Sequence, residues 1–274
     1  MHVTYYTDPA SPGSWGEEPS LRRVLARFGE GVAISYVMGG LARRIDDPLR
    51  MLREVLDVAA ESAMPVDPRL WLEHPPASSY PVCMAVKAAA EQGSAAAYRY
   101  LRRLREGLMV GRRKLDHADS LVAEAGPAGL DTDRFRVDLG SHAITEAFAA
   151  DLDEVRAVPA EARSAGQVRA TEGKDRLALP STLFAGDGGR HSVWGRHPYE
   201  AYREAALAAG ARQVNDGPLE ALAAVERFGS IATREASELA QRPAPVVEAA
   251  LWNLATEWKL RPVAALTGTL WESA

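Results

Sequence analysis

The sequence predicts an α/β fold, with an open sheet that is interrupted by a large helical insertion and followed by a small C-terminal module. The first forty residues alternate strand, helix and strand patterns. Ala- and Arg-rich helical patterns fill the middle of the chain, and strand patterns return after residue 180. With 274 residues and 47% hydrophobic content, the chain is long enough to bury a core without disulfides.

The N-terminal elements form a strand–helix–strand unit. Residues His2–Tyr6 are a β-type run, residues 7–14 are turn formers, and Trp15–Phe28 carry apolar residues at helical spacing. Val32–Met38 is again strand-like. Such a unit predicts parallel strands joined by a right-handed crossover.

The middle of the chain, residues 47–169, is predicted to be a helical insertion. Its clearest helical segments are Met51–Ser62, Pro81–Gln92, Ala95–Val110 and Asp116–Ala125. Strand patterns then recur at Ser181–Phe184 and His191–Trp194 around a glycine-rich turn, which predicts a β-hairpin. A helix over Pro198–Ala209 completes a split domain made of residues 1–46 and 170–214.

Residues 215–274 are predicted to form a small winged-helix-like module after a linker at residues 215–218. Its predicted elements are helices over Leu219–Phe228, Thr233–Ala240 and Pro243–Ala255 and a hairpin over Val263–Leu270. Thr233 is predicted to cap the second helix. From Pro218 onward there are five bases and seven acids, so the net charge is 5 − 7 = −2, and Pro243–Ala255 has no base. These charges argue against DNA binding and favour a docking or dimerisation role.

Composition excludes several functional classes. The net charge is −5, which gives no basic field for nucleic acid or anionic lipid, and no apolar stretch is long enough for a membrane span. The N-terminus lacks the pattern of a secretory signal, so we expect a cytoplasmic protein. The six histidines show no ligand spacing, and we expect no metal site. Cys83 is the single cysteine, so no disulfide can form within one chain; we expect it to be a buried apolar residue and not an acidified thiol.

Residues Ser11-Pro12-Gly13-Ser14 stand where the first strand gives way to a helix. The start of a helix presents unpaired amides that stabilise an anion, which gives this position chemical potential. The same residues also suit a purely structural role, with Ser11 as N-cap and Pro12 at the first helical position.

The order of several motifs resembles the FrnE-type branch of the DsbA family. The motifs are Asp8-Pro9, Ser11-Pro12-Gly13-Ser14-Trp15, Glu18-Pro19, Tyr36–Leu41, Ser79–Cys83 and Leu179–Phe184. The resemblance covers about residues 1–210 and implies a thioredoxin-like fold with a helical insertion and a cis-proline at Pro180. Ser11 and Ser14 occupy the two positions that are cysteines in that family. Serine forms no disulfide, so the chain cannot carry out dithiol exchange.

The resemblance leaves two functions open. In the first, a redox-silent protein uses the groove around Ser11, Pro12, Ser14, Trp15, Leu179 and Pro180 to bind a protein client or a thiol-bearing ligand, as DsbA-like adaptors that deliver clients to a protease do. In the second, the chain is an enzyme, because its Ser-Pro-x-Ser-Trp motif is also similar to that of kappa-class glutathione transferases and hydroxychromene carboxylate isomerases. That likeness implies Ser11 as the catalytic residue, beside Ser14, donating a hydrogen bond to the sulfur of glutathione or another low-molecular-weight thiol. The oligomeric state stays open, including a homo-oligomer.

Overall fold

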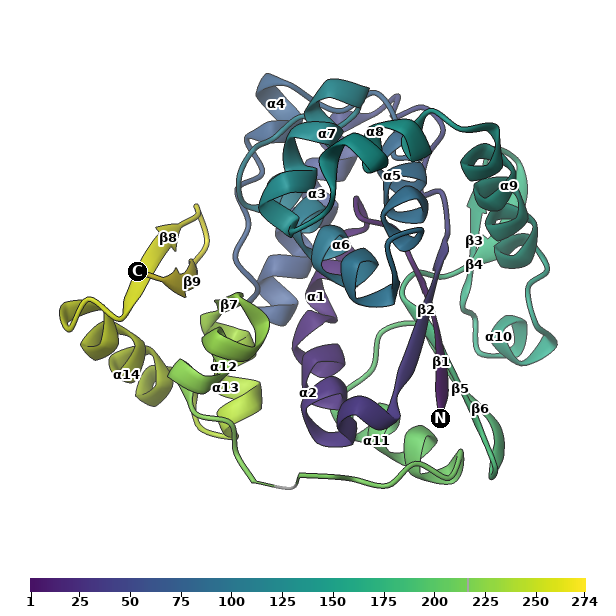
Figure 1. Cartoon of the computed structure of the whole chain (residues 1–274). Helices are drawn as coiled ribbons and strands as arrows, with labels where there is room; N and C mark the ends of the chain where they lie inside the picture. The colour runs from purple at the N-terminus through teal and green to yellow at the C-terminus, as the bar shows by residue number, and fades with distance from the viewer. Residues whose placement is uncertain (216) are drawn as a thin grey trace.

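A four-stranded mixed sheet lies at the centre of the protein, which a computed structural model describes over residues 1–215 and 217–274. The strand order is β2-β1-β5-β6 (Figure 1). Strand β1 (His2–Thr7) runs parallel to β2 (Ala33–Met38) and antiparallel to β5 (Ser181–Gly186), which pairs in turn with β6 (Gly189–Trp194). The predicted strand–helix–strand unit and the terminal hairpin are therefore confirmed. Residue 216 of the predicted linker lies outside the described residues.

The helix predicted over Trp15–Phe28 is two helices, α1 (Pro12–Gly16) and α2 (Glu18–Phe28). The interruption falls at Glu17, just before Pro19. Proline has no amide hydrogen to donate to the preceding turn, so a continuous helix cannot pass through this position without losing a bond. The break shortens α1 to five residues and weakens the dipole expected at the Ser11 end, because the dipole builds up with helix length.

Helices cover both faces of the sheet. Helix α2 and helix α11 (Tyr199–Ala208) pack on one face, where Val3, Phe28 and Phe184 are buried together. Helices α9 (His142–Arg156) and α10 (Ala160–Ser164) cover the other face. Strands β1, β2 and β5 therefore bury side chains on both sides, whereas the edge strand β6 buries only Val193.

The insertion between β2 and β5 is helical, as predicted. Its other helices are α3 (Pro48–Ser62), α4 (Leu70–Glu73), α5 (Tyr80–Ala90), α6 (Ser94–Met109), α7 (Ala118–Ala125) and α8 (Thr132–Leu139). Helices α5 to α9 enclose the largest apolar core, to which the sheet contributes Tyr5 and Met38. Helix α3 packs in a separate core with Trp15 and Trp71. The predicted fold class, a thioredoxin-like α/β fold with a large helical insertion, is thus confirmed.

A two-stranded hairpin that sequence analysis missed connects the insertion to the sheet. Strand β3 (Val168–Thr171) pairs antiparallel with β4 (Lys174–Leu177). The predicted boundary between residues 169 and 170 falls inside β3. The second strand contains Lys174 and Asp175, residue types that are depleted in strands, so the local signal for this hairpin is weak.

The C-terminal residues form three helices and a three-stranded sheet of order β7-β9-β8. The elements are α12 (Ala221–Phe228), β7 (Ser230–Ala232), α13 (Thr233–Ala240), α14 (Ala244–Thr256), β8 (Leu260–Ala264) and β9 (Thr269–Ser273). The prediction that Thr233 is an N-cap is wrong, because it is the first helical residue and its hydroxyl accepts a hydrogen bond from the Trp271 indole at 2.9 Å. The Glu235 carboxylate serves the helix start instead, accepting from the Ala232 amide at 2.6 Å.

A buried ion cluster joins the C-terminal module to the rest of the protein where α13 packs on α2 (Figure 1). Glu235 lies 3.1 Å from the Arg22 Nε and accepts two hydrogen bonds from Arg102, at 2.7 and 3.0 Å. Glu18 completes the cluster by pairing with Arg102 and Arg105. All five side chains are buried. None of the helices in the described ranges has the length and apolar composition needed to cross a membrane.

Candidate functional site

Ser11 begins α1 and stands at the edge of a cavity. Its Oγ accepts a hydrogen bond from the Ser14 amide at 3.2 Å, and its backbone is extended, so it is the N-cap that the sequence predicts. Pro12 follows at the first helical position. Both residues line the cavity, although the Ser11 side chain is almost wholly buried.

Ser14 points away from the cavity. It is fully buried, and its Oγ accepts a hydrogen bond from the Thr7 hydroxyl at 2.9 Å. Thr7 in turn contacts the Arg105 guanidinium. Across the described residues, no histidine or carboxylate is hydrogen-bonded to either serine hydroxyl. The site therefore lacks the neighbouring base that activates a serine nucleophile.

Leu179 and Pro180 close over the Gly13 turn. The peptide bond between them is cis. A Cβ on Gly13 would lie 2.9 Å from the Leu179 carbonyl oxygen, so only glycine permits this approach. The side chain of Leu179 packs against Gly39 and lines the cavity, whereas Pro180 is buried behind it.

Trp15 lies in the core and not at the cavity. Its indole donates a hydrogen bond to the Pro65 carbonyl at 3.0 Å, and the Arg102 guanidinium stacks 4.5 Å from its ring. Tryptophan is usually buried in this way, with its polar N–H satisfied. The structure thus brings Ser11, Pro12 and Leu179 together at the cavity, while Ser14, Trp15 and Pro180 support it from inside.

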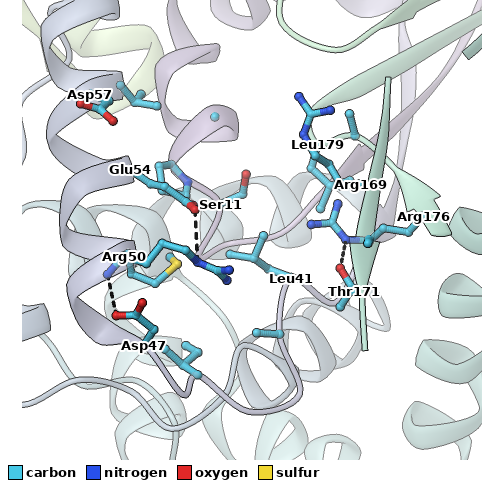
Figure 2. Close-up of a pocket in the computed structure, with 18 of the residues that line it drawn as sticks. Ser11, Leu41, Asp47, Arg50, Glu54, Asp57, Arg169, Thr171, Arg176 and Leu179 are labelled. Atoms are coloured by element: carbon cyan, nitrogen blue, oxygen red, sulfur yellow. Dashed lines mark hydrogen bonds and ion pairs between the residues drawn. The ribbon is translucent and has the colours of Figure 1, made fainter. Parts of the chain in front are cut away.

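The cavity measures about 630 Å³ and is bounded by the start of α1, by α3, by the loop after β2 and by the β3–β4 hairpin. Figure 2 shows α3 side chains facing the hairpin across it. The acids Asp47, Glu54 and Asp57 lie on the α3 side, and Arg169 and Arg176 lie on the hairpin side. The two arginines are the main site residues that sequence analysis missed, because the hairpin that carries them was not predicted.

Glu17, at the break between α1 and α2, is a buried acid next to this region. Burial raises the pKa of its carboxyl from 4.5 to about 8. Hydrogen bonds with Ser20 and Tyr202 and the positive charge of Arg196 oppose this rise only in part. Its Oε1 atom has no hydrogen-bond partner. Glu17 is therefore mostly protonated near neutral pH.

Cys83, on α5, is fully buried, as the sequence predicts. Its thiol donates a hydrogen bond to Asp8 Oδ2 at 3.1 Å. Burial and the neighbouring Asp8 carboxylate raise the pKa of this thiol well above its usual range. Cys83 is thus a poor nucleophile, and no acidified thiol replaces the missing pair.

We expect native Cys83 to resist modification. At mildly alkaline pH, its reaction with Ellman's reagent should be at least about 100-fold slower than in guanidinium chloride, because the thiol is both inaccessible and protonated. A stopped-flow comparison of native and denatured protein measures this ratio. Equal rates would mean that the loop around Asp8 opens readily.

Comparisons with known proteins identify the family of the chain. A family profile described as "Thioredoxin" matches residues 5–158, more than half of the chain. The chain belongs to this thioredoxin family. The ClpXP adapter protein SpxH of Halalkalibacterium halodurans is 28% identical over 218 residues, covering 74% of this chain and 65% of the relative. The chain thus spans just under two thirds of that protein. SpxH of Bacillus subtilis is 24% identical over 282 residues, covering 100% of this chain and 89% of the relative.

Solved structures of DsbA-like proteins share the fold. The cytosolic disulfide reductase DsbM of Pseudomonas aeruginosa superposes with a TM-score of 0.58 at 18% identity, over 76% of this chain and 98% of DsbM. A probable DsbA oxidoreductase of Streptomyces coelicolor gives a TM-score of 0.53 at 22% identity, over 81% of this chain and 96% of that one. At such identities the likeness establishes a DsbA-like thioredoxin fold.

Proposed function

We propose that this protein is a redox-silent, DsbA-like binding protein that holds a protein client in the cavity beside Ser11. One observation carries the proposal. Ser11 and Ser14, at the positions of the cysteines, both accept hydrogen bonds from within the protein, yet a cavity of about 630 Å³ is open beside Ser11. The usual chemistry of the site is lost while its binding surface is retained.

The adapter relatives support a protein client. SpxH proteins are named as adapters of ClpXP, and the alignment with the Bacillus subtilis protein extends over this whole chain, C-terminal module included. We also propose that the chain belongs to the FrnE-type branch. We propose that its domains are residues 1–46 with 170–214, residues 47–169 and residues 215–274, and that residues 215–274 have a winged-helix-like fold. The helix–strand–helix–helix–strand–strand order of that module favours the winged-helix assignment. The lone cysteine is in keeping with a cytoplasmic location.

The second candidate is a thiol-dependent isomerase or transferase, with glutathione or another small thiol as co-substrate. The position of Ser11 at the cavity edge, next to Leu179, favours it. Ser11 would then hold the thiol sulfur, and Ser14 would have only an indirect part because its hydroxyl faces Thr7.

Filling the cavity should weaken client binding. Ala170 is an exposed cavity residue on β3, so Ala170→Trp adds bulk without disturbing the core, and we expect it to weaken binding of a purified client at least about tenfold. The client is found by affinity capture and cross-linking, and its affinity is then measured by calorimetry. Ala150→Trp, on the exposed side of α9, is the matched control and should bind as the wild type does.

Titration with reduced glutathione separates the two candidates. The binding proposal expects no saturable glutathione site and no effect of Ser11→Ala on small-thiol affinity. Saturable glutathione binding that Ser11→Ala removes, with client binding unaffected by Ala170→Trp, would overturn the proposal in favour of the thiol-dependent enzyme.

A further inference from the structure

The β3–β4 hairpin places two arginines directly opposite each other. Arg169 and Arg176 are partners in the antiparallel register, so their side chains emerge on the same face of the hairpin. Like charges in this arrangement repel and destabilise a hairpin. Such a pair is expected only where something else compensates the charge.

Neither guanidinium has a directly paired carboxylate in the part of the chain that the structure describes. No carboxylate oxygen there lies within the 4.0 Å of an ion pair from Arg169 or Arg176. Arg176 donates only to the Thr171 hydroxyl, at 3.0 Å, and to the Leu177 carbonyl, at 2.9 Å. Arg169 donates to the carbonyls of Gly166 and Val168, at 3.3 and 2.9 Å.

Arg176 is also nearly inaccessible from outside, with 6% of its surface exposed. Burying a charged group is costly, and here desolvation lowers the pKa of the Arg176 guanidinium. The more distant Asp8 carboxylate opposes this shift, and the neighbouring Arg169 adds to it. The part of Arg176 that remains accessible lines the cavity, and Figure 2 shows its guanidinium directed there from the strand.

The other arginines of the cavity differ in this respect. Arg44 pairs with Asp46 at 2.5 Å, Arg50 with Glu54 at 3.5 Å, and Arg196 with Glu61. The cavity arginines without an ion-pair partner among the described residues therefore lie on the hairpin side, opposite the acids of α3. This polarity would orient a bound chain that carries an acidic group at one end of the cavity.

We propose that Arg169 and Arg176 form a subsite for a carboxylate of the bound client, so that the cavity selects an acidic peptide segment. This inference rests on the proposed binding function and specifies the chemistry of its client. A carboxylate between two guanidinium groups would accept charge-assisted hydrogen bonds from both and remove their mutual repulsion.

The test uses two fluorescein-labelled, amide-capped peptides in an alanine–serine background, one with a central pair of glutamates and one with glutamines in their place. Fluorescence anisotropy should show the full-length wild-type protein binding the glutamate peptide at least about tenfold more tightly. Arg176→Gln and Arg169→Gln should each remove most of that preference. Arg136→Gln is the matched control, because Arg136 lies on α8 and not in the cavity lining, is 61% exposed and already pairs with Asp119. It should change affinity less than about twofold.

Arg169→Gln also gives a readout that does not depend on any ligand. Removing one of two opposed positive charges should raise the melting temperature of the free protein by about 1–3 °C. Arg169 is exposed, so this variant stays informative even if Arg176→Gln fails to fold.

Equal affinity for the two peptides, or equal losses in Arg136→Gln and Arg169→Gln, would overturn the subsite. Binding of inorganic phosphate without any binding of the glutamate peptide would likewise overturn the choice of an acidic peptide. The two proposals can fail separately. If Ala170→Trp loses the client but Arg169→Gln retains it, cavity binding stands and only the carboxylate subsite is overturned.

Discussion

Replacing Glu235 by alanine is expected to lower the free energy of unfolding by about 3–5 kcal/mol, because the substitution leaves buried positive charge without a partner. Glu235 is fully buried. Its carboxylate lies 3.1 Å from the Arg22 Nε and accepts two hydrogen bonds from Arg102. The variant also frees the buried Ala232 amide at the start of α13. Urea unfolding followed by circular dichroism measures the loss.

Glu248→Ala is the control for this effect. Glu248 is an exposed glutamate on α14 of the same module, and its loss should change stability by less than about 0.5 kcal/mol. A small effect of Glu235→Ala would show that water reaches Arg22 and Arg102. In that case the C-terminal module would part readily from α2 and would not be a fixed part of the molecule.

The elements that were predictable from sequence are those with a local signal. The apolar spacing of Val32–Met38 and the glycine turn between β5 and β6 depend on neighbouring residues, and both predictions are confirmed. Ser11 as N-cap is another local feature, since its partner is only three residues away. Such features can be read without knowing the rest of the fold.

Long-range polar contacts left no comparable signal. Glu18 suits an early helical turn, yet it lies against Arg105, 87 residues further on, and Arg102 reaches Glu235 across 133 residues. A charged residue is expected at the surface unless its partner is known, so the buried cluster could not be predicted. For the same reason the burial of Arg176 beside the cavity could not be predicted, because residues distant in the sequence form that cavity.

Glu17 is expected to make the protein less stable as the pH rises from about 5 to about 9. Its folded-state pKa of about 8 exceeds the 4.5 of the exposed side chain, so the folded protein holds a proton that the unfolded chain releases. The stabilising contribution of this proton is complete below pH 4.5 and is lost as the pH passes through about 8. Glu17→Gln cannot ionise and should therefore exceed the wild type in stability by about 2–4 kcal/mol at high pH.

Urea midpoints measured across this pH range distinguish this effect from a general gain in packing. The advantage of Glu17→Gln should shrink steadily towards acid pH, because a protonated glutamate and a glutamine are nearly equivalent in size and charge. Glu226→Gln, an exposed substitution on α12, should follow the wild-type profile throughout. An advantage of Glu17→Gln that is the same at every pH would place Glu17 in contact with water. The break between α1 and α2 would then be an open feature of the surface beside the Ser11 cavity.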